Sequence, residues 1–235
     1  MTLEEASGAP RITRVEHFGR RGLEVRLHLT EGEPLQVALE AFERSGLGGG
    51  DSLPSDRRRA LLDADADFRV RESALNILSY RARTRAELAR KLRTKGFDAE
   101  RVGRCLDRLA ERGLLDDAAV AAAFVRDRLR HRPRGRALLT YELRGKGVSA
   151  ELAGGVIEEV FADEQVSDVQ LARDIADGWV ARQGRPLLHA LTSESRTPER
   201  EKAHRRLRSY LGRRGIRGDA LRAGIQQALN SARAP

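Results

Sequence analysis

The sequence is poor in the residues on which several protein classes depend. Among 235 residues there is one cysteine, and aromatic residues make up 4% of the chain. A single cysteine cannot form an intrachain disulfide, which fits a reducing cytoplasm. Cys105 stands among apolar residues, so we interpret it as a small core residue rather than a nucleophile or metal ligand. Scarce aromatics favour a core of Leu, Val, Ile and Ala, which suits small helical units.

Signals for membranes are also missing. No apolar run approaches the ~20 residues that a membrane-spanning helix needs. Residues 1–5 are acidic and lack the apolar stretch of a secretory signal. The sequence therefore predicts a soluble, cytoplasmic protein without a membrane partner.

Strings typical of enzyme and metal sites are absent. There is no Walker A string, no His-Glu-x-x-His and no paired-cysteine motif, and the five histidines lack metal-ligand spacing. Asp116 and Asp117 are better explained as a helix start than as an acid–base pair. The glycine-rich residues 47–51 lack a following Lys-Ser/Thr, so we interpret them as a linker rather than a phosphate cradle. We predict a protein that is not an enzyme and needs no cofactor or metal.

Arginine is what the chain has in excess. The net charge is +9, the isoelectric point is about 10.6 and charged residues make up 34% of the chain. This favours a polyanionic partner: nucleic acid, a nucleoprotein assembly or an acidic protein face. The alternative is that a GC-rich genome encodes solvated helix faces with arginine, so charge alone is weak evidence.

One pattern occurs three times: Leu, three residues, Leu, two residues, a basic residue, Gly and a large apolar residue. The copies begin at Leu88, Leu139 and Leu207. Leucines at i and i+4 share one helix face, and the glycine can take the left-handed conformation that ends a helix. Repeated in phase, the pattern predicts an internal repeat whose units each contain such a marked helix.

The spacing of the copies predicts three tandem units. Leu92 and Leu143 are 51 residues apart, whereas Leu143 and Leu211 are 68 apart, so the third unit has gained 17 residues. Proline and serine residues place the addition near 184–199, as either an irregular loop or a lengthening of the flanking helices.

The predicted fold class is mainly α: an elongated, curved array of three tandem three-helix repeats, preceded by a small N-terminal β-hairpin element. Alternating apolar residues at 23–29 predict one strand of the hairpin, residues 12–18 its partner and residues 37–44 a short helix. The predicted divisions are residues 1–53 for the hairpin element and linker, 54–114 for repeat 1, 115–162 for repeat 2, and 163–235 for repeat 3 with its insertion near 184–199.

Several strings resemble the RecX regulatory proteins of bacteria. They are residues 74–78 (Ala-Leu-Asn-Ile-Leu), 83–88 (Arg-Thr-Arg-Ala-Glu-Leu), 92–97 (Leu-Arg-Thr-Lys-Gly-Phe) and 113–117 (Gly-Leu-Leu-Asp-Asp). Residues 142–148 (Glu-Leu-Arg-Gly-Lys-Gly-Val) look like the family's second-repeat signature. The resemblance covers about residues 70–160 and is weaker over the third unit, which has the insertion. The N-terminal hairpin is similar to an element found in some members.

The resemblance implies a non-enzymatic regulator of homologous recombination, DNA repair and the SOS response. RecX proteins bind the RecA recombinase filament in its groove on single-stranded DNA. They inhibit filament extension, ATPase, strand exchange and co-protease activity, and many bind DNA weakly. The expected partners are thus a RecA filament and single- or double-stranded DNA without sequence preference, and we expect a monomer.

Basic clusters are the candidate partner surfaces. Arginine forks bind carboxylate or phosphate in a bidentate manner, so residues 126–136, the densest charge run, could contact an acidic recombinase face or DNA. The alternative for any one arginine is a solvated helix end. For Lys95, Lys146 and Arg214, which recur in register, helix-end charge compensation is the favoured role. The candidate residues are Arg81, Arg83, Arg85, Arg90, Arg93, Arg126, Arg128, Arg130, Arg132, Arg134, Arg136 and Arg144.

A helical repeat protein that acts directly on DNA without RecA is the alternative function. Sequence-specific base reading is disfavoured because Arg90, Tyr141 and Ser209 occupy equivalent exposed positions. The tyrosines and Trp179 are too scattered in sequence to predict a stacking platform for single strands.

Overall fold

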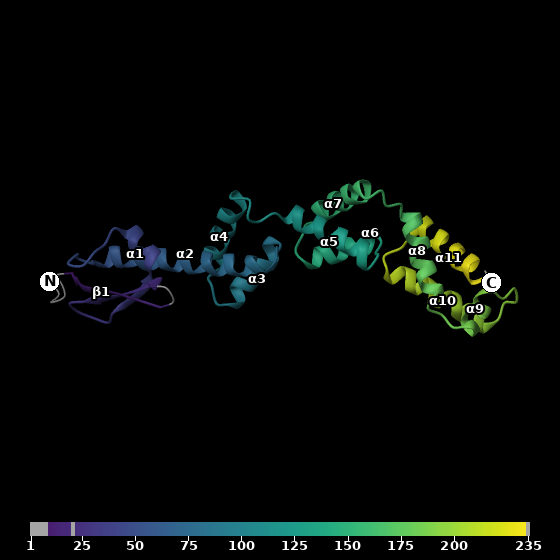
Figure 1. Cartoon of the computed structure of the whole chain (residues 1–235), viewed down its shortest axis with the longest axis horizontal. Helices are drawn as coiled ribbons and strands as arrows, with labels where there is room; N and C mark the ends of the chain where they lie inside the picture. The colour runs from purple at the N-terminus through teal and green to yellow at the C-terminus, as the bar shows by residue number, and fades with distance from the viewer. Residues whose placement is uncertain (1–8, 20–21, 234–235) are drawn as a thin grey trace, which may run out of the picture. The chain divides into compact units, whose positions relative to one another are not determined.

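The structure is a computed structural model that describes residues 9–19 and 22–233 (Figure 1). The acidic residues 1–5, and residues 20–21 between the two predicted hairpin strands, lie outside the described residues. The chain forms two compact units, Met1–Ala82 with Leu88–Leu114, and Arg83–Glu87 with Leu115–Pro235. The predicted fold class is confirmed in that the protein is mainly helical, with a small β element at its N-terminal end.

A three-stranded antiparallel sheet begins the first unit. Its strands are β1 (Ile12–Phe18), β2 (Glu24–Leu29) and β3 (Leu35–Ala38), in that order across the sheet. The β1–β2 hairpin agrees with the sequence prediction, whereas β3 takes the first two residues of the predicted helix 37–44. Helix α1 (Leu39–Ser45) begins only after β3. Leu35 and Val37 alternate with an exposed glutamine and pair with β2, so burial on the sheet outweighs their helical spacing.

Helix α2 (Ser55–Tyr80) is the long element of the first unit. Its first half covers the sheet, where Leu61 joins a core that includes the fully buried Ile12, Val25 and Val37. Its second half packs on α4 (Ala99–Glu111), and α3 (Arg85–Thr94) lies between α2 and α4 in sequence. Residues 47–51, the predicted linker, are bound to the sheet, because the Ile12 amide donates a 2.9 Å hydrogen bond to the Asp51 carbonyl.

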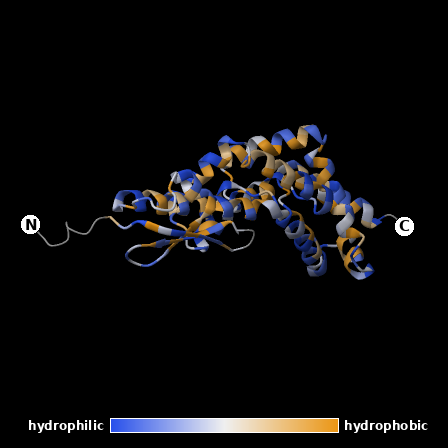
Figure 2. Cartoon of the chain, turned by 60° about the vertical axis from the view of Figure 1, so that its left-hand side comes forward, coloured by the Kyte–Doolittle hydropathy of each residue, from blue (hydrophilic) through white to orange (hydrophobic). Residues whose placement is uncertain are grey.

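The second unit is helical and has one continuous core. Its helices are α5 (Asp117–His131), α6 (Arg136–Gly145), α7 (Ala150–Asp163), α8 (Asp168–Val180), α9 (Arg185–Thr192), α10 (Pro198–Arg213) and α11 (Gly218–Arg233). In Figure 2 hydrophilic and hydrophobic positions alternate along the helices. The insertion near 184–199 forms α9 and the start of a lengthened α10, so a purely irregular loop is the wrong alternative. Leu191 of α9 is buried in the core.

The marked helices are α3, α6 and the second part of α10. Their paired leucines at 88 and 92, 139 and 143, and 207 and 211 are all fully buried. Gly96, Gly147 and Gly215 follow the helices with φ of 89°, 83° and 80°. The amide of the residue after each glycine donates a hydrogen bond to the carbonyl of the second leucine, as Ile216 does to Leu211 (3.1 Å). This hydrogen bond is characteristic of the Schellman motif. The predicted helix ending is confirmed in all three copies.

Within the second unit, the end of one marked helix rests on the start of another. The Gly135 amide, just before α6, donates a 2.7 Å hydrogen bond to the Arg214 carbonyl at the end of α10. The end of α6 makes an equivalent contact, since Thr84 Oγ1 donates 2.6 Å to the Lys146 carbonyl. Lys146 Nζ also lies 3.0 Å from Glu87 Oε1. The same junction therefore occurs twice, and Lys146 binds a specific carboxylate in addition to any helix-end role.

Candidate functional site

The first arginine cluster lies before and along α3. Arg90 and Arg93 are exposed, while Leu88 and Leu92 of the same helix are buried, so these arginines lie on the outward face of the helix. Arg81 and Arg83 precede the helix, and Arg85 begins it. The exposed pair is thus available to an external carboxylate or phosphate.

The densest charge run is largely engaged within the second unit. Arg126 and Arg130 share a face of α5, and that face meets carboxylates at the end of α7. Arg126 Nη2 lies 3.0 Å from Asp163 Oδ2, and its Nε lies 3.3 Å from Glu164 Oε1. Arg130 Nη2 lies 3.5 Å from the same Glu164 oxygen. A partner would have to compete with these acidic side chains.

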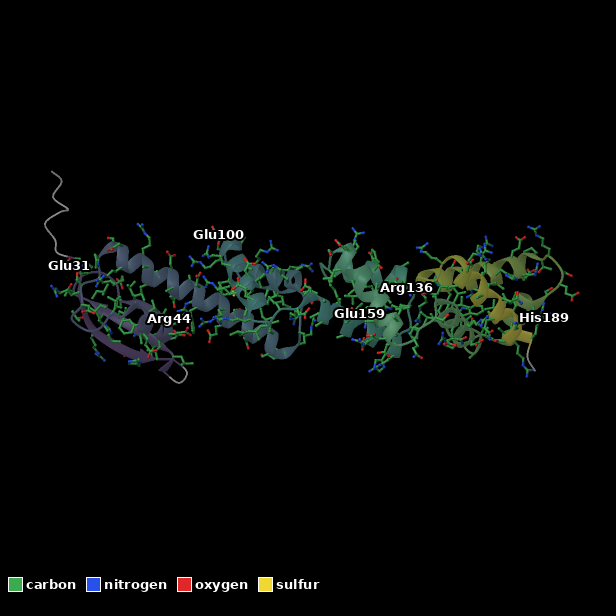
Figure 3. The ribbon with its side chains drawn as sticks, turned by 90° about the horizontal axis from the view of Figure 1, so that it is seen from above. Glu31, Arg44, Glu100, Arg136, Glu159 and His189 are labelled. Carbon is green, nitrogen blue, oxygen red and sulfur yellow. The ribbon has the colours of Figure 1, made fainter. Side chains whose placement is uncertain are left out.

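Arg128 and Arg136 also have internal partners. The Arg128 guanidinium carbon lies 4.3 Å from the ring centroid of Phe124, and Arg136 lies 4.2 Å from that of Phe161. Arg136 Nε donates a 2.8 Å hydrogen bond to Asp168. Figure 3 labels Arg136, which begins α6. Guanidiniums that are stacked and paired in this way stabilise the packing of helices, so they are less available to a ligand.

Positive charge accumulates instead where α6 meets the end of α10. Arg132, Arg134, Arg213 and Arg214 line a hollow of about 480 Å³ whose lining has one carboxylate, Glu142. Arg134 pairs with that carboxylate. Burial lowers the pKa of Arg134, and Arg128, Arg214 and Arg132 lower it further by repulsion. The hollow therefore contains more positive charge than the single carboxylate of Glu142 can neutralise.

Two further hollows adjoin this one and contain aromatic rings. Arg213 also lines a hollow of about 420 Å³, and Arg214 one of about 270 Å³; Tyr210 lines both. The Tyr210 and Trp179 ring centroids are 6.4 Å apart. Arg182 Nη2 donates a 2.7 Å hydrogen bond to the Tyr210 hydroxyl. We name these three hollows together the basic groove; its cationic residues and its tyrosine are Arg132, Arg134, Arg182, Lys202, Arg205, Arg206, Tyr210, Arg213 and Arg214.

The basic groove can bind a phosphate backbone without reading bases. Its cationic side chains suit phosphate oxygens, and the half-buried Tyr210 offers an aromatic surface beside them. Of the predicted arginines only Arg132 and Arg134 belong to it, while the exposed Arg144 lies on α6 outside its lining. Sequence reasoning missed Tyr210 and Arg182 because α8 and α10 bring them together from distant positions. The basic residues between positions 205 and 214 are the feature of the sequence that could have indicated this site.

Neither a metal-ligand cluster nor a membrane-spanning helix occurs in the described ranges. Among these residues no group of three or more His, Cys, Asp and Glu side chains is arranged to hold a metal ion. Cys105 is buried, and that burial raises the pKa of its thiol, which disfavours the reactive thiolate. In the same ranges no helix is both long enough and apolar enough to cross a membrane.

Comparisons with known proteins agree with the tandem helical triplets. The family model described as "RecX, first three-helix domain" matches residues 71–109, and "RecX, second three-helix domain" matches residues 116–156. The chain is 37% identical to the regulatory protein RecX of Halorhodospira halophila over 159 residues, which are 68% of this chain and 88% of that protein. It is 27% identical to RecX of Clostridium botulinum strain Alaska E43 over 220 residues, 94% of this chain and 97% of that one.

A solved structure shares the fold. The crystal structure of a regulatory protein RecX covers 94% of this chain with a TM-score of 0.67 at 21% identity, and the chain covers 98% of that structure. The tandem triplets and their relatives define a regulatory protein rather than an enzyme. The chain belongs to the RecX family.

Proposed function

We propose that this protein regulates the RecA recombinase. It binds the RecA filament in its groove on single-stranded DNA and inhibits filament extension, ATPase, strand exchange and co-protease activity. Family membership supports the assignment to RecA, and the basic groove supports a partner that contains nucleic acid. We further propose that it acts in the cytoplasm and that it is a monomer. Sedimentation of the full chain would test the oligomeric state.

The observation that carries the proposal is the charge surplus around Glu142. Four arginines line that hollow against one carboxylate, and two of them, Arg132 and Arg213, are exposed. By contrast, Arg126 and Arg130 are held by carboxylates of their own unit. We therefore assign partner contact first to the basic groove, then to the exposed Arg90, Arg93 and Arg144.

The test measures RecA ATPase on single-stranded DNA with this protein added. The variant carries Arg132→Glu, Arg144→Glu and Arg213→Glu, three exposed positions of the second unit. Its matched control carries Arg57→Glu, Arg58→Glu and Arg59→Glu, exposed positions of α2 with the same change in net charge. We expect the first variant to lose inhibition at concentrations where the control still inhibits. Equal inhibition by both would contradict the assignment.

The basic groove also favours a second candidate function, direct action on DNA without RecA. Binding of a single-stranded oligonucleotide in the absence of RecA distinguishes the two. If a variant carrying only Arg132→Glu and Arg213→Glu, both in the groove, loses DNA binding but still inhibits RecA ATPase, the groove serves DNA alone. If both activities fall together, the groove serves the nucleoprotein filament.

A further inference from the structure

The first unit contains a cavity that the proposed function does not use. It measures about 330 Å³ and is lined by residues of α1, α2 and α4. Ala41, Cys105 and Leu109 are buried apolar residues of its lining, and the half-buried ring of Phe68 adds a flat surface. Arg44 of α1, labelled in Figure 3, belongs to the same lining. The cavity therefore combines an apolar lining with charge.

The charge in the lining is strongly unbalanced. Two carboxylates of the lining, Glu40 and Asp67, face five guanidiniums, and Asp63 beside the cavity lies 3.0 Å from Arg101, which leaves a surplus of two positive charges. Small-molecule sites are typically apolar with few polar groups, so this density of arginine indicates an anionic ligand. The five arginines are Arg44, Arg71, Arg101, Arg108 and Arg112.

The carboxylates hold several of these guanidiniums in place. Glu40 accepts a hydrogen bond from Arg71, which keeps the pKa of the Glu40 carboxyl below its usual range. Its Oε1 also lies 3.4 Å from Arg44 Nη1. Asp67 Oδ1 lies 2.7 Å from Arg101 Nη1.

Two arginines are held less firmly. Arg108 Nη1 lies 3.7 Å from Asp67 Oδ2. Arg112 is exposed, and across the described part of the chain no carboxylate forms an ion pair with it. Arg108 and Arg112 are thus the groups best placed to meet an incoming anion.

We propose that this cavity binds a nucleoside monophosphate, either free or as the 5′-phosphorylated end of a DNA strand. A phosphate monoester carries about −1.5 to −2 charges at pH 7, which matches the surplus better than a single carboxylate does. Arginine forks bind phosphate in a bidentate manner. Small-molecule sites begin at about 300 Å³, so the cavity suits one nucleotide, with its base against the apolar lining.

Isothermal titration of the full chain with dAMP tests the proposal. In the double variant Arg108→Ala and Arg112→Ala we expect affinity for dAMP to fall by at least about tenfold. The matched control is Arg104→Ala: Arg104 also lies on α4 and is 3.5 Å from Asp67, but it is not part of the cavity lining. The control should bind dAMP like the unmodified chain. Equal affinities of the double variant and the control would overturn the proposal, as would failure of the unmodified chain to bind either dAMP or a 5′-phosphorylated strand.

A second variant separates loss of space from loss of charge. Ala64→Phe places a ring in the cavity at an exposed position and leaves every arginine intact. It should lose dAMP while keeping the helical content of the unmodified chain, and unchanged dAMP affinity would overturn the proposal.

Competition identifies the source of the phosphate. An oligonucleotide with a 5′-phosphate, but not one with a 5′-hydroxyl, should displace dAMP if the DNA end is the ligand. If neither displaces it, the free nucleotide is the ligand. Displacement by both equally would contradict a phosphate-end site. RecA inhibition is scored separately, so this proposal and the assignment to RecA can fail independently.

Discussion

The backbone amide of Gly135 donates a 2.7 Å hydrogen bond to the carbonyl oxygen of Arg214, and this contact leaves no room for side chains on the glycines around it. A Cβ atom on Gly215 would lie 2.6 Å from the backbone nitrogen of Leu138. Gly215 also has a φ of 80°, which L-residues rarely adopt. Glycine is therefore needed at position 215 for two reasons. Its positive φ ends α10, and its lack of a side chain lets the start of α6 come close.

Gly215→Ala should destabilise the second unit. We expect the free energy of unfolding to fall by about 2–5 kcal/mol, from the left-handed backbone and from steric overlap with Leu138. Denaturant titration followed by fluorescence of Trp179, the one tryptophan of the chain, reports on this unit. The control Gly218→Ala has positive φ but no atom within 4 Å of its Cβ, so its loss should be smaller. Equal losses would show that the close approach does not matter.

Leu191→Ala tests whether the insertion is part of the core. Leu191 is buried in α9, and truncation of such a side chain costs about 2–5 kcal/mol. The same fluorescence titration should show this loss. His189→Ala, an exposed position on the same helix, should change stability little. A Leu191 variant as stable as the His189 variant would mean that α9 is dispensable for folding.

Asp65→Ala tests a buried carboxylate in the first unit. Asp65 Oδ1 accepts a 2.7 Å hydrogen bond from the Ala38 amide, where β3 gives way to α1, and its Oδ2 accepts from Arg69. Losing it leaves a buried amide without its partner, which costs about 1–3 kcal/mol. Arg69→Ala removes only the partly exposed ion-pair partner and should cost less than about 1 kcal/mol. Thermal unfolding by circular dichroism compares them, and equal shifts would refute the role of Ala38.

His204 should make the second unit sensitive to mild acid. Burial lowers its pKa in the folded chain, with repulsion from Arg200 and Arg208 adding to the effect. The unfolded chain therefore takes up a proton at higher pH, so stability is present above the ordinary pKa of about 6.5 and is lost as pH falls below it. His204→Gln should flatten the fall in melting temperature between about pH 7 and about pH 5. His189→Gln, at an exposed position, is the control, and an equal flattening by it would contradict the assignment.

Salt dependence should report on the basic groove. If Arg205 and Arg206 contact phosphates, Arg205→Ala with Arg206→Ala should reduce the slope of log affinity against log salt by up to about 1.4, since each contact with a single strand contributes about 0.7. Fluorescence anisotropy with a labelled single strand measures it. Arg57→Ala with Arg58→Ala is the control of equal charge. The same slope in all three proteins would exclude these phosphate contacts.

The parts of the fold that local sequence determines were predictable. The ending at Gly96, Gly147 and Gly215 involves only a backbone angle and hydrogen bonds within a few residues, so the repeated pattern was enough to place it. Strand β3 was not predicted, because residues 37–44 satisfy helical spacing as well as alternation. Only pairing of Val37 with Val25 across the sheet decides between them.

The candidate site was less predictable, because it depends on which distant side chains meet. The run 126–136 is conspicuous in sequence, yet the positions of Asp163 and Glu164 decide that Arg126 is already paired. Tyr210 and Trp179 are 31 positions apart and become neighbours only through the packing of α8 and α10. Charge density along a chain therefore indicates where arginines are, but not which of them are available to a ligand.

Helix α2 is continuous, so the direction in which its first half faces the sheet is fixed relative to the direction in which its second half faces α4. Leu61 faces the sheet and Val70 lies buried further along the same helix. Each residue advances a helix by about 100°. One residue inserted between Leu61 and Val70 would therefore rotate the side of α2 that covers the sheet by about a quarter of a turn relative to the rest of the helix. Seven inserted residues would nearly restore it, with a drift of ~20°. Length variation between the two halves of α2 should therefore come in steps close to whole numbers of helical turns, such as seven or eleven residues.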